Sequence, residues 1–183
     1  MKDMLDFLNR SPSRFHAVDN LCRELSGAGY EPLFEGRAWT LTPGGKYYAV
    51  RGGSALIAFR LPADPARGFM ISASHSDAPT FRIKENAELA GPEGYLRLNT
   101  ERYGGMLCAP WLDRPLTVAG RVLVRAGHGI ETRLVYVDRD LLMIPNVAIH
   151  MNRNANDGFK YDPKCDMVPL MGLGTEKGAF RAV

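Results

Sequence analysis

The stretch "ISASHSDAPTF", Ile71 to Phe81, decides the fold class of this sequence. It continues the run "FMISAS", whose apolar or small residues are typical of a strand covered on both faces. Because a helix and several strands are predicted upstream, the chain is expected to begin as an α/β domain. The run stops at His75, and Asp77 follows two residues later. Two polar side chains at the end of a buried strand raise the question of a metal site.

His75 and Asp77 are expected on the same side of the chain, because residues i and i+2 of an extended backbone point the same way. They would emerge together at the carboxyl end of the strand, where open α/β sheets place ligands. A histidine can offer a ring nitrogen to zinc, and a nearby carboxylate can bind metal or orient another group. The spacing leaves two interpretations open, a metal site or a strand end hydrogen-bonded into its loop.

The region before this stretch predicts one helix and three strands. Ser11 can cap the helix, and Pro12 suits its first position. Its apolar face consists of residues at helical spacing, namely Phe15, Val18, Leu21, Cys22 and Leu25. From Trp39 the period changes to two, and "AWTLT", "KYYAVR" and "SALIAFRL" predict an antiparallel meander with glycine-rich turns.

The second half of the chain is predicted to be β-rich. "FRIKENAEL" favours a surface strand, and short strands are expected in "YLRLNT", "LTVAGRVLVR" and "ETRLVYVD". The polar, Gly- and Pro-rich tail from residue 151 to 178 is expected to form loops. Because "AGPEG" interrupts the pattern, we predict a boundary near residue 90, with an α/β part over 1–90 and a β-rich part over 91–183.

The composition is that of a globular protein. Of 183 residues, 45% are hydrophobic and 23% are charged. The net charge is +3 and the Lys and Arg residues are scattered, so neither a nucleic-acid nor a membrane partner is expected. Three distant cysteines and a start without a long apolar run indicate a reduced, cytoplasmic protein.

Asp113 in "WLDRP" is a further candidate carboxylate. It could bind metal, but Arg114 and Pro115 beside it suit a turn at the entry to a strand, and we favour the turn. The sequence holds no HExxH or GxSxG motif and no Cys–His pairing.

Six ordered stretches together resemble the aspartyl aminopeptidase family of dinuclear zinc metallopeptidases. They are "SPSRFHAV", "GGKYYAVR", "SHSDAPTFRIK", "YLRLNTERYGG", "WLDRPLTVAGRV" and "IPNVAIHMNRN", and they span nearly the whole chain in the family's order. The resemblance implies an α/β catalytic domain interrupted by a β-rich dimerisation domain. Residues 1–90 would then belong to the catalytic domain and residues 91–183 to the dimerisation domain.

The same resemblance implies roles for three residues. His75 matches a zinc ligand. Asp77 matches a carboxylate that does not bind zinc itself but supports the residues around it and helps to set up catalysis. His150, in "AIHMNRN", matches a histidine that reaches the active site of the neighbouring subunit and contacts substrate there. On the residues alone, His150 would more often be a structural histidine within a sheet.

The activity implied is an aminopeptidase with two zinc ions per site, which releases acidic N-terminal residues from peptides. The family forms homo-oligomers, dodecamers built from dimers. Its remaining ligands and general base are expected beyond residue 183, in a chain more than twice as long. Since His75 and Asp77 cannot hold two zinc ions, which need three or four protein ligands each, this chain alone is expected to be inactive. The alternative is a truncated, non-catalytic assembly protein that keeps the dimer surface.

Overall fold

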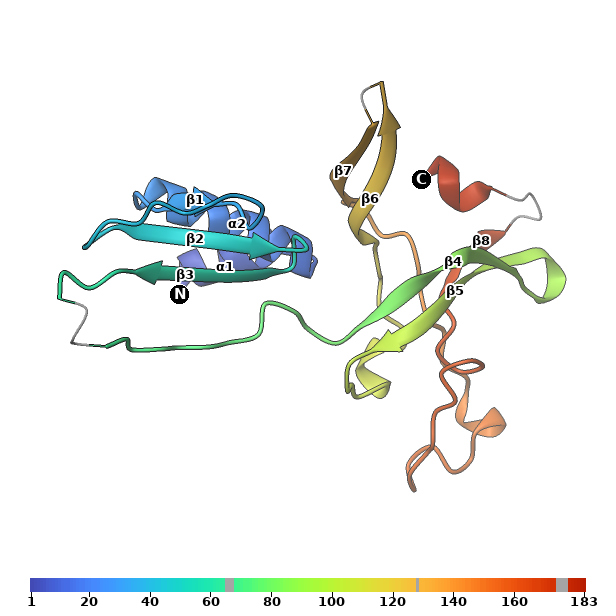
Figure 1. The fold of residues 1–183 in the computed structure, drawn as a ribbon. Coiled ribbons are helices and arrows are strands. Elements are labelled where there is room, and N and C mark those ends of the chain that lie inside the picture. The colour runs from blue at the N-terminus through green and yellow to red at the C-terminus, as the bar shows by residue number, and fades with distance from the viewer. Residues whose placement is uncertain (65–67, 128, 174–177) are drawn as a thin grey trace. The chain divides into compact units, whose positions relative to one another are not determined.

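The computed structural model of the protein describes residues 1–64, 68–127, 129–173 and 178–183. Figure 1 shows a mixture of helices and strands, so the predicted α/β class is confirmed. By its internal contacts the chain divides into two compact units. Unit 1 comprises Met1–Ala78 with Ala119–Val135, and unit 2 comprises Pro79–Val118 with Tyr136–Val183.

Unit 1 opens with two helices, α1 (Lys2–Asn9) and α2 (Arg14–Gly27). The sequence analysis predicted α2 and missed α1. It also chose the wrong cap, because Ser13 has the extended backbone of a cap and its side chain accepts a hydrogen bond from the His16 amide at 3.4 Å. The hydroxyl of Ser11 instead accepts from Asn20 Nδ2 at 3.1 Å, so it fixes the approach to the helix.

Three strands form the sheet of unit 1, in the order β1 (Glu31–Leu33), β2 (Lys46–Arg51) and β3 (Ala55–Arg60). β2 and β3 pair antiparallel, as predicted, whereas β1 runs parallel to β2. The predicted meander is therefore wrong at its first strand. Residues 38–42 form no strand, and the indole of Trp39 donates to the Phe34 carbonyl at 2.9 Å, which folds this segment back locally.

The core of unit 1 lies between α2 and the sheet. α2 contacts all three strands. Ala17 and Val18 on the helix are buried, as are Tyr47, Tyr48 and Ala49 on the central strand. The Tyr48 hydroxyl keeps a polar partner, Ser26 Oγ at 3.1 Å, as buried tyrosines usually do.

The buried strand predicted over "FMISAS" is wrong. Residues 69–74 form no strand, and Phe69, Met70 and Ile71 are 62%, 103% and 90% exposed. A strand buried on both faces needs neighbours for its backbone hydrogen bonds and layers over its side chains. No strand among the described residues pairs with this segment. The pattern thus identified a segment suited to burial but could not supply its partners.

Unit 2 contains an antiparallel sheet in the order β4 (Thr80–Ala90), β5 (Tyr95–Tyr103) and β8 (Leu170–Leu173). The first two strands confirm the strands predicted in "FRIKENAEL" and "YLRLNT". β8 corrects the prediction that the tail is all loop, because it hydrogen-bonds to β5. Residues 174–177 of that tail lie outside the described residues.

The boundary predicted near residue 90 falls at the turn of the β4–β5 hairpin. This turn is a short 3₁₀ helix (Pro92–Gly94) in which Glu93 has a φ of 52°. The first break in the division by contacts lies between Ala78 and Pro79, and the chain returns to unit 1 over Ala119–Val135. The assignment of 1–90 and 91–183 to catalytic and dimerisation domains stays a prediction.

The core of unit 2 forms around Cys108, Ile144 and Met167. Phe81 and Trp111 pack against it, edge to face, with ring centroids 5.1 Å apart. Cys108 and the other two cysteines are free thiols. The remaining strands are β6 (Ala119–Ala126) and β7 (Gly129–Tyr136), which form a two-stranded sheet in the regions predicted. No helix in the described part of the chain is both long and apolar enough to cross a membrane.

Candidate metal centre

His75 and Asp77 lie together, as their spacing predicted. His75 Nδ1 is 3.1 Å from Asp77 Oδ1. A carboxylate can only accept a hydrogen bond, so Nδ1 is the donor. The imidazole side chain is 93% exposed, against 30% for the carboxylate. The pair therefore presents to solvent a ring whose Nε2 lone pair is available to a metal ion.

Ser76 anchors the backbone between these two residues. Its hydroxyl donates to the Ser54 carbonyl at 3.0 Å, just before β3 begins. The chain bends at Ser76, and this bond holds the bend against the residue that precedes β3. His75 and Asp77 therefore lie together although the segment forms no strand.

The residues present fit one position of a metal centre. A histidine that binds metal commonly donates its second ring N–H to a carboxylate, which fixes its tautomer and orientation. His75 and Asp77 have this arrangement. Protein zinc sites need three or four ligands, however, and the described residues contain no group of three or more His, Cys, Asp or Glu side chains that could hold a metal ion. The chain supplies a ligand and its support, but not a whole site.

His150 lies on a 3₁₀ helix (Ile149–Met151) in unit 2. The structural sheet histidine considered above is wrong, because the residue is exposed and belongs to no strand. Its neighbours Val147, Ile149 and Met151 are 54%, 49% and 80% exposed. A polar ring among exposed apolar side chains is suited to contact another molecule.

Asp113 forms a turn, as we favoured. Its φ of 56° is left-handed, a conformation that Asp tolerates better than most residues. Its carboxylate accepts from the Asn146 amide at 2.8 Å, and its own amide donates to the Ile144 carbonyl at 2.9 Å. Asp113 therefore fixes the start of the segment that carries His150. Sequence analysis missed this link because the two motifs lie 33 residues apart.

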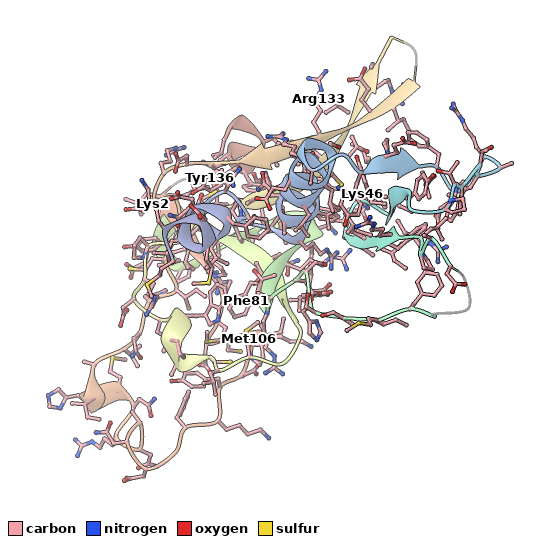
Figure 2. The ribbon with its side chains drawn as sticks, turned by 90° about the vertical axis from the view of Figure 1, so that its left-hand side faces the viewer. Lys2, Lys46, Phe81, Met106, Arg133 and Tyr136 are labelled. Atoms are coloured by element: carbon pink, nitrogen blue, oxygen red, sulfur yellow. The ribbon has the colours of Figure 1, made fainter. Side chains whose placement is uncertain are left out.

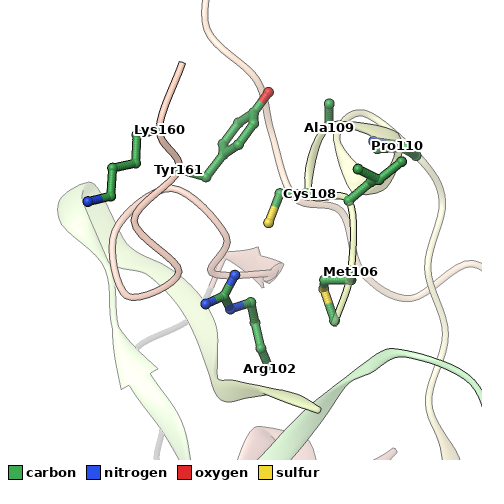
Figure 3. Close-up of a pocket in the computed structure, with 8 residues that line it drawn as sticks. Arg102, Met106, Cys108, Ala109, Pro110, Lys160 and Tyr161 are labelled. Atoms are coloured by element: carbon green, nitrogen blue, oxygen red, sulfur yellow. The ribbon is translucent and has the colours of Figure 1, made fainter. Parts of the chain in front are cut away.

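Unit 2 also contains an open cavity of about 540 Å³ (Figure 3). Met106, Cys108 and Tyr161 contribute to its apolar wall, and Arg102 and Lys160 are its charged residues. None of the three predicted site residues lines it. The lining residues of the cavity are therefore not ones to which the sequence assigned a role.

Comparison with known proteins identifies the family. Residues 7–181 match the family described as aminopeptidase I zinc metalloprotease (M18). The chain belongs to the M18 family. The resemblance seen in the six ordered motifs is thereby confirmed, and it extends over almost the whole chain.

Among curated M18 relatives, a probable M18 family aminopeptidase 2 from Clostridium acetobutylicum is 45% identical over 180 residues. The alignment covers 96% of this chain and 42% of that protein. A probable M18 family aminopeptidase 2 from Pseudomonas putida is 40% identical, with coverage of 98% and 43%. The chain thus spans about two fifths of the length of these relatives.

Solved M18 structures have the same fold over a similar share of their length. Chaetomium thermophilum mApe1 superposes with a TM-score of 0.86 at 33% identity, covering 99% of this chain and 43% of that one. The S. cerevesiae mApe1 dodecamer gives a TM-score of 0.78 at 27% identity, with coverage of 96% and 38%. The described fold is therefore a portion of the M18 aminopeptidase fold.

Proposed function

We propose that this chain forms the N-terminal portion of a zinc-dependent aminopeptidase that releases N-terminal residues, acidic ones in particular, from peptides. The observation that carries the proposal is the exposed His75 ring, oriented by Asp77 at 3.1 Å, within a chain that matches the M18 family. The acidic preference rests on the resemblance to aspartyl aminopeptidases. A cytoplasmic location belongs to the same proposal and rests on the reduced cysteines.

Each of the three site residues has a separate task in this enzyme. His75 supplies one ligand through Nε2, and Asp77 holds its ring and tautomer. His150, on its exposed turn, contacts the peptide bound to a neighbouring subunit. Zinc, two ions per complete site, supplies Lewis-acid activation of the scissile carbonyl.

The partners proposed are a peptide substrate and further copies of the same protein. The S. cerevesiae mApe1 structure, whose fold this chain shares in part, is a dodecamer. A residue that acts on a neighbouring subunit requires such an assembly, because its own site is incomplete without the second copy. The role proposed for His150 therefore depends on the homo-oligomer, whereas the homo-oligomer does not depend on that role.

A non-catalytic assembly protein is the second candidate. The observation that favours it is that the described residues bring together no group of three metal-ligating side chains. Such a protein would keep the surfaces that join copies without completing a metal centre. The two candidates differ in what happens when the remaining portion of the family fold is supplied. The aminopeptidase should then hydrolyse peptides, and the assembly protein should not.

The test is a chimera in which residues 1–183 replace the matching segment of the Clostridium acetobutylicum relative. We expect the chimera to hydrolyse a chromogenic N-terminal Asp or Glu substrate faster than a Leu substrate, in a zinc-dependent manner. His75→Ala should abolish turnover and lower bound zinc, as measured by elemental analysis after dialysis. His16→Ala is the matched control, since His16 lies on α2, and it should leave both unchanged. A folded chimera that binds zinc and hydrolyses neither substrate would favour the assembly protein.

A further inference from the structure

The β6–β7 hairpin is a sheet of only two strands (Figure 1). No other strand in the described ranges pairs with either of them. Two-stranded sheets are marginally stable alone, and an open edge presents unpaired N–H and C=O groups that can accept another strand. The hairpin is therefore a candidate surface for addition of a strand.

β6 attaches the hairpin to the rest of unit 1. The Arg121 guanidinium donates to the Gly52 carbonyl at 2.6 Å and lies 4.5 Å from the centroid of the Phe15 ring. β6 also contacts α2. β6 is thus held against the rest of unit 1 through its side chains, and no strand that the structure describes pairs with the outer edge of β7.

β7 is itself a self-complementary sequence. Ile130 and Leu134, which are 75% and 38% exposed, are placed symmetrically about Thr132. Glu131 and Arg133 are placed symmetrically about the same residue. Figure 2 labels Arg133 on this strand. Each apolar residue has an apolar counterpart, and each charge an opposite one.

We propose that β7 pairs antiparallel with β7 of a second copy, about a two-fold axis through Thr132. This register sets Ile130 opposite Leu134 of the second copy, Glu131 opposite its Arg133, and Thr132 opposite its own counterpart. By symmetry the first two pairs occur twice, as an isologous interface requires. Apolar, opposite-charge and Thr–Thr pairs are the cross-strand pairs that stabilise antiparallel sheets.

Other registers lack this complementarity. An axis that passes between two residues is excluded by the pleat, because it would set residues from opposite faces of the sheet against each other. An axis through Glu131 or Arg133 sets like charges opposite each other, which destabilises a sheet. β6 cannot substitute, because "AGRVLVRA" contains two arginines and no acidic residue. The sequence of β7 therefore selects one register as well as one strand.

The exchange of partners on association costs little. Within one copy, Arg133 Nη2 lies 3.2 Å from Glu131 Oε2, and the two side chains are 64% and 34% exposed. Exposed ion pairs of this kind contribute little to stability. In the paired strands each group meets an opposite charge on the second copy instead. The interface gives the homo-oligomer proposed above a specific surface, and it requires no peptidase activity.

Disulfide crosslinking tests the axis. In a Cys165→Ser background, which removes the exposed thiol, Thr132→Cys places two thiols opposite each other across the axis. Facing residues of antiparallel strands have Cα atoms about 4.5–5.5 Å apart, within the range of about 4.4–6.8 Å that a disulfide spans. We expect mild oxidation to give a covalent dimer on non-reducing gels. Arg133→Cys is the matched control and should stay monomeric on the gel, since it faces residue 131 of the second copy.

Charge reversal tests the pairing independently. Glu131→Lys and Arg133→Glu each create two like-charge pairs across the interface, so each should raise the dimer dissociation constant by about tenfold or more in sedimentation. Mixing the two variants restores opposite charges across the axis, so a heterodimer of near wild-type affinity should form. Circular dichroism shows whether each variant is folded before its dissociation constant is measured.

Four results would overturn the inference. The first three are a wild-type chain that stays monomeric at high micromolar concentration, equal crosslinking through Arg133→Cys, and a dimer that neither charge reversal weakens. The fourth concerns a single chain that carries both Glu131→Lys and Arg133→Glu. If dimer affinity returns in that chain but not in the mixture of single variants, the two charges act within one copy and the inference is wrong. Because no readout uses peptide hydrolysis, failure here is distinguishable from failure of the proposed aminopeptidase.

Discussion

Asp77 fixes which ring nitrogen of His75 carries the hydrogen. The carboxylate accepts from Nδ1, whereas an imidazole free in water favours hydrogen on Nε2. We therefore expect Asp77→Ala to shift the neutral His75 ring toward the Nε2–H tautomer. Long-range ¹⁵N–¹H correlation spectra recorded at alkaline pH measure this directly. Ser76→Ala, which removes a neighbouring bond but not this one, should leave the tautomer unchanged; an unchanged tautomer in Asp77→Ala would show that the contact does not hold in solution.

Single residues were predictable where their environment is local. The i, i+2 rule placed His75 beside Asp77, and the chemistry of "WLDRP" predicted the turn at Asp113. His150 was not predictable in this way, because its exposure depends on how distant segments pack. The link from Asp113 to the segment before His150 depends on a bond that spans 33 residues.

The cap of α2 allows a direct measurement at the level of the element. Ser13→Ala removes the hydroxyl that accepts from the His16 amide, and loss of such a cap costs about 0.5–2 kcal/mol. We expect the free energy of unfolding in urea to fall by that amount. Ser11→Ala is the matched control and should cost less, because Asn20 Nδ2 keeps its bond to the Arg10 carbonyl at 2.7 Å. Equal losses in the two variants would contradict the assignment of Ser13 as the cap.

The Glu88 carboxylate on β4 holds Gly178 and Phe180 through hydrogen bonds whose strength depends on pH. Hydrogen bonds from the Gly178 and Phe180 amides lower the pKa of the Glu88 carboxyl. Because the pKa is lower in the folded chain, these bonds stabilise it above the unfolded pKa and are lost as the pH falls through the folded value. The two amide signals should therefore titrate below the usual pKa of glutamate in NMR spectra. Glu88→Gln should abolish that titration, and a midpoint at or above the usual value would contradict the contact.

Elements were predictable where short-range pattern and local partner coincide. "KYYAVR" and "SALIAFRL" are joined by a tight glycine turn, so each strand finds its partner at once, and both were predicted correctly. "FMISAS" has an equally clear pattern, but the layers that would cover it are not among the described residues. "AWTLT" alternates only over five residues, too few to override the local bond from Trp39 to Phe34. A hydrophobic pattern predicts that a segment can be buried. Whether it is buried depends on which other segments pack against it.

For the whole molecule, ordered motifs were more informative than patterns. Six stretches in one order identified the family that the comparisons confirm over residues 7–181. The division into units was less accessible, because the β4–β5 hairpin continues across the change in composition near residue 90. A change in composition is a local property of the sequence. A compact unit is defined by contacts between residues that are distant in sequence, which composition does not reveal.

The role of His150 can be tested only in an assembled enzyme. In the active chimera, His150→Ala should lower kcat by roughly a hundred- to thousandfold, about 2.7–4 kcal/mol, if the ring donates to the developing oxyanion of the substrate. Bound zinc should stay unchanged, because this histidine contacts substrate and not metal. Asn152→Ala, close to the same exposed turn, is the control and should leave turnover near that of the parent.

Subunit mixing then shows whether His150 acts within its own chain or across the boundary. If it acts across, a dead His75→Ala chain and a dead His150→Ala chain complement each other, because some sites combine an intact His75 with an intact His150 from the neighbour. Activity should therefore reappear on mixing, once native mass spectrometry shows that the oligomers exchange subunits. If it acts within its own chain, no mixed site holds both residues and the mixture stays dead. Loss of zinc in His150→Ala would instead make this residue a ligand, and the assignment to substrate would be wrong.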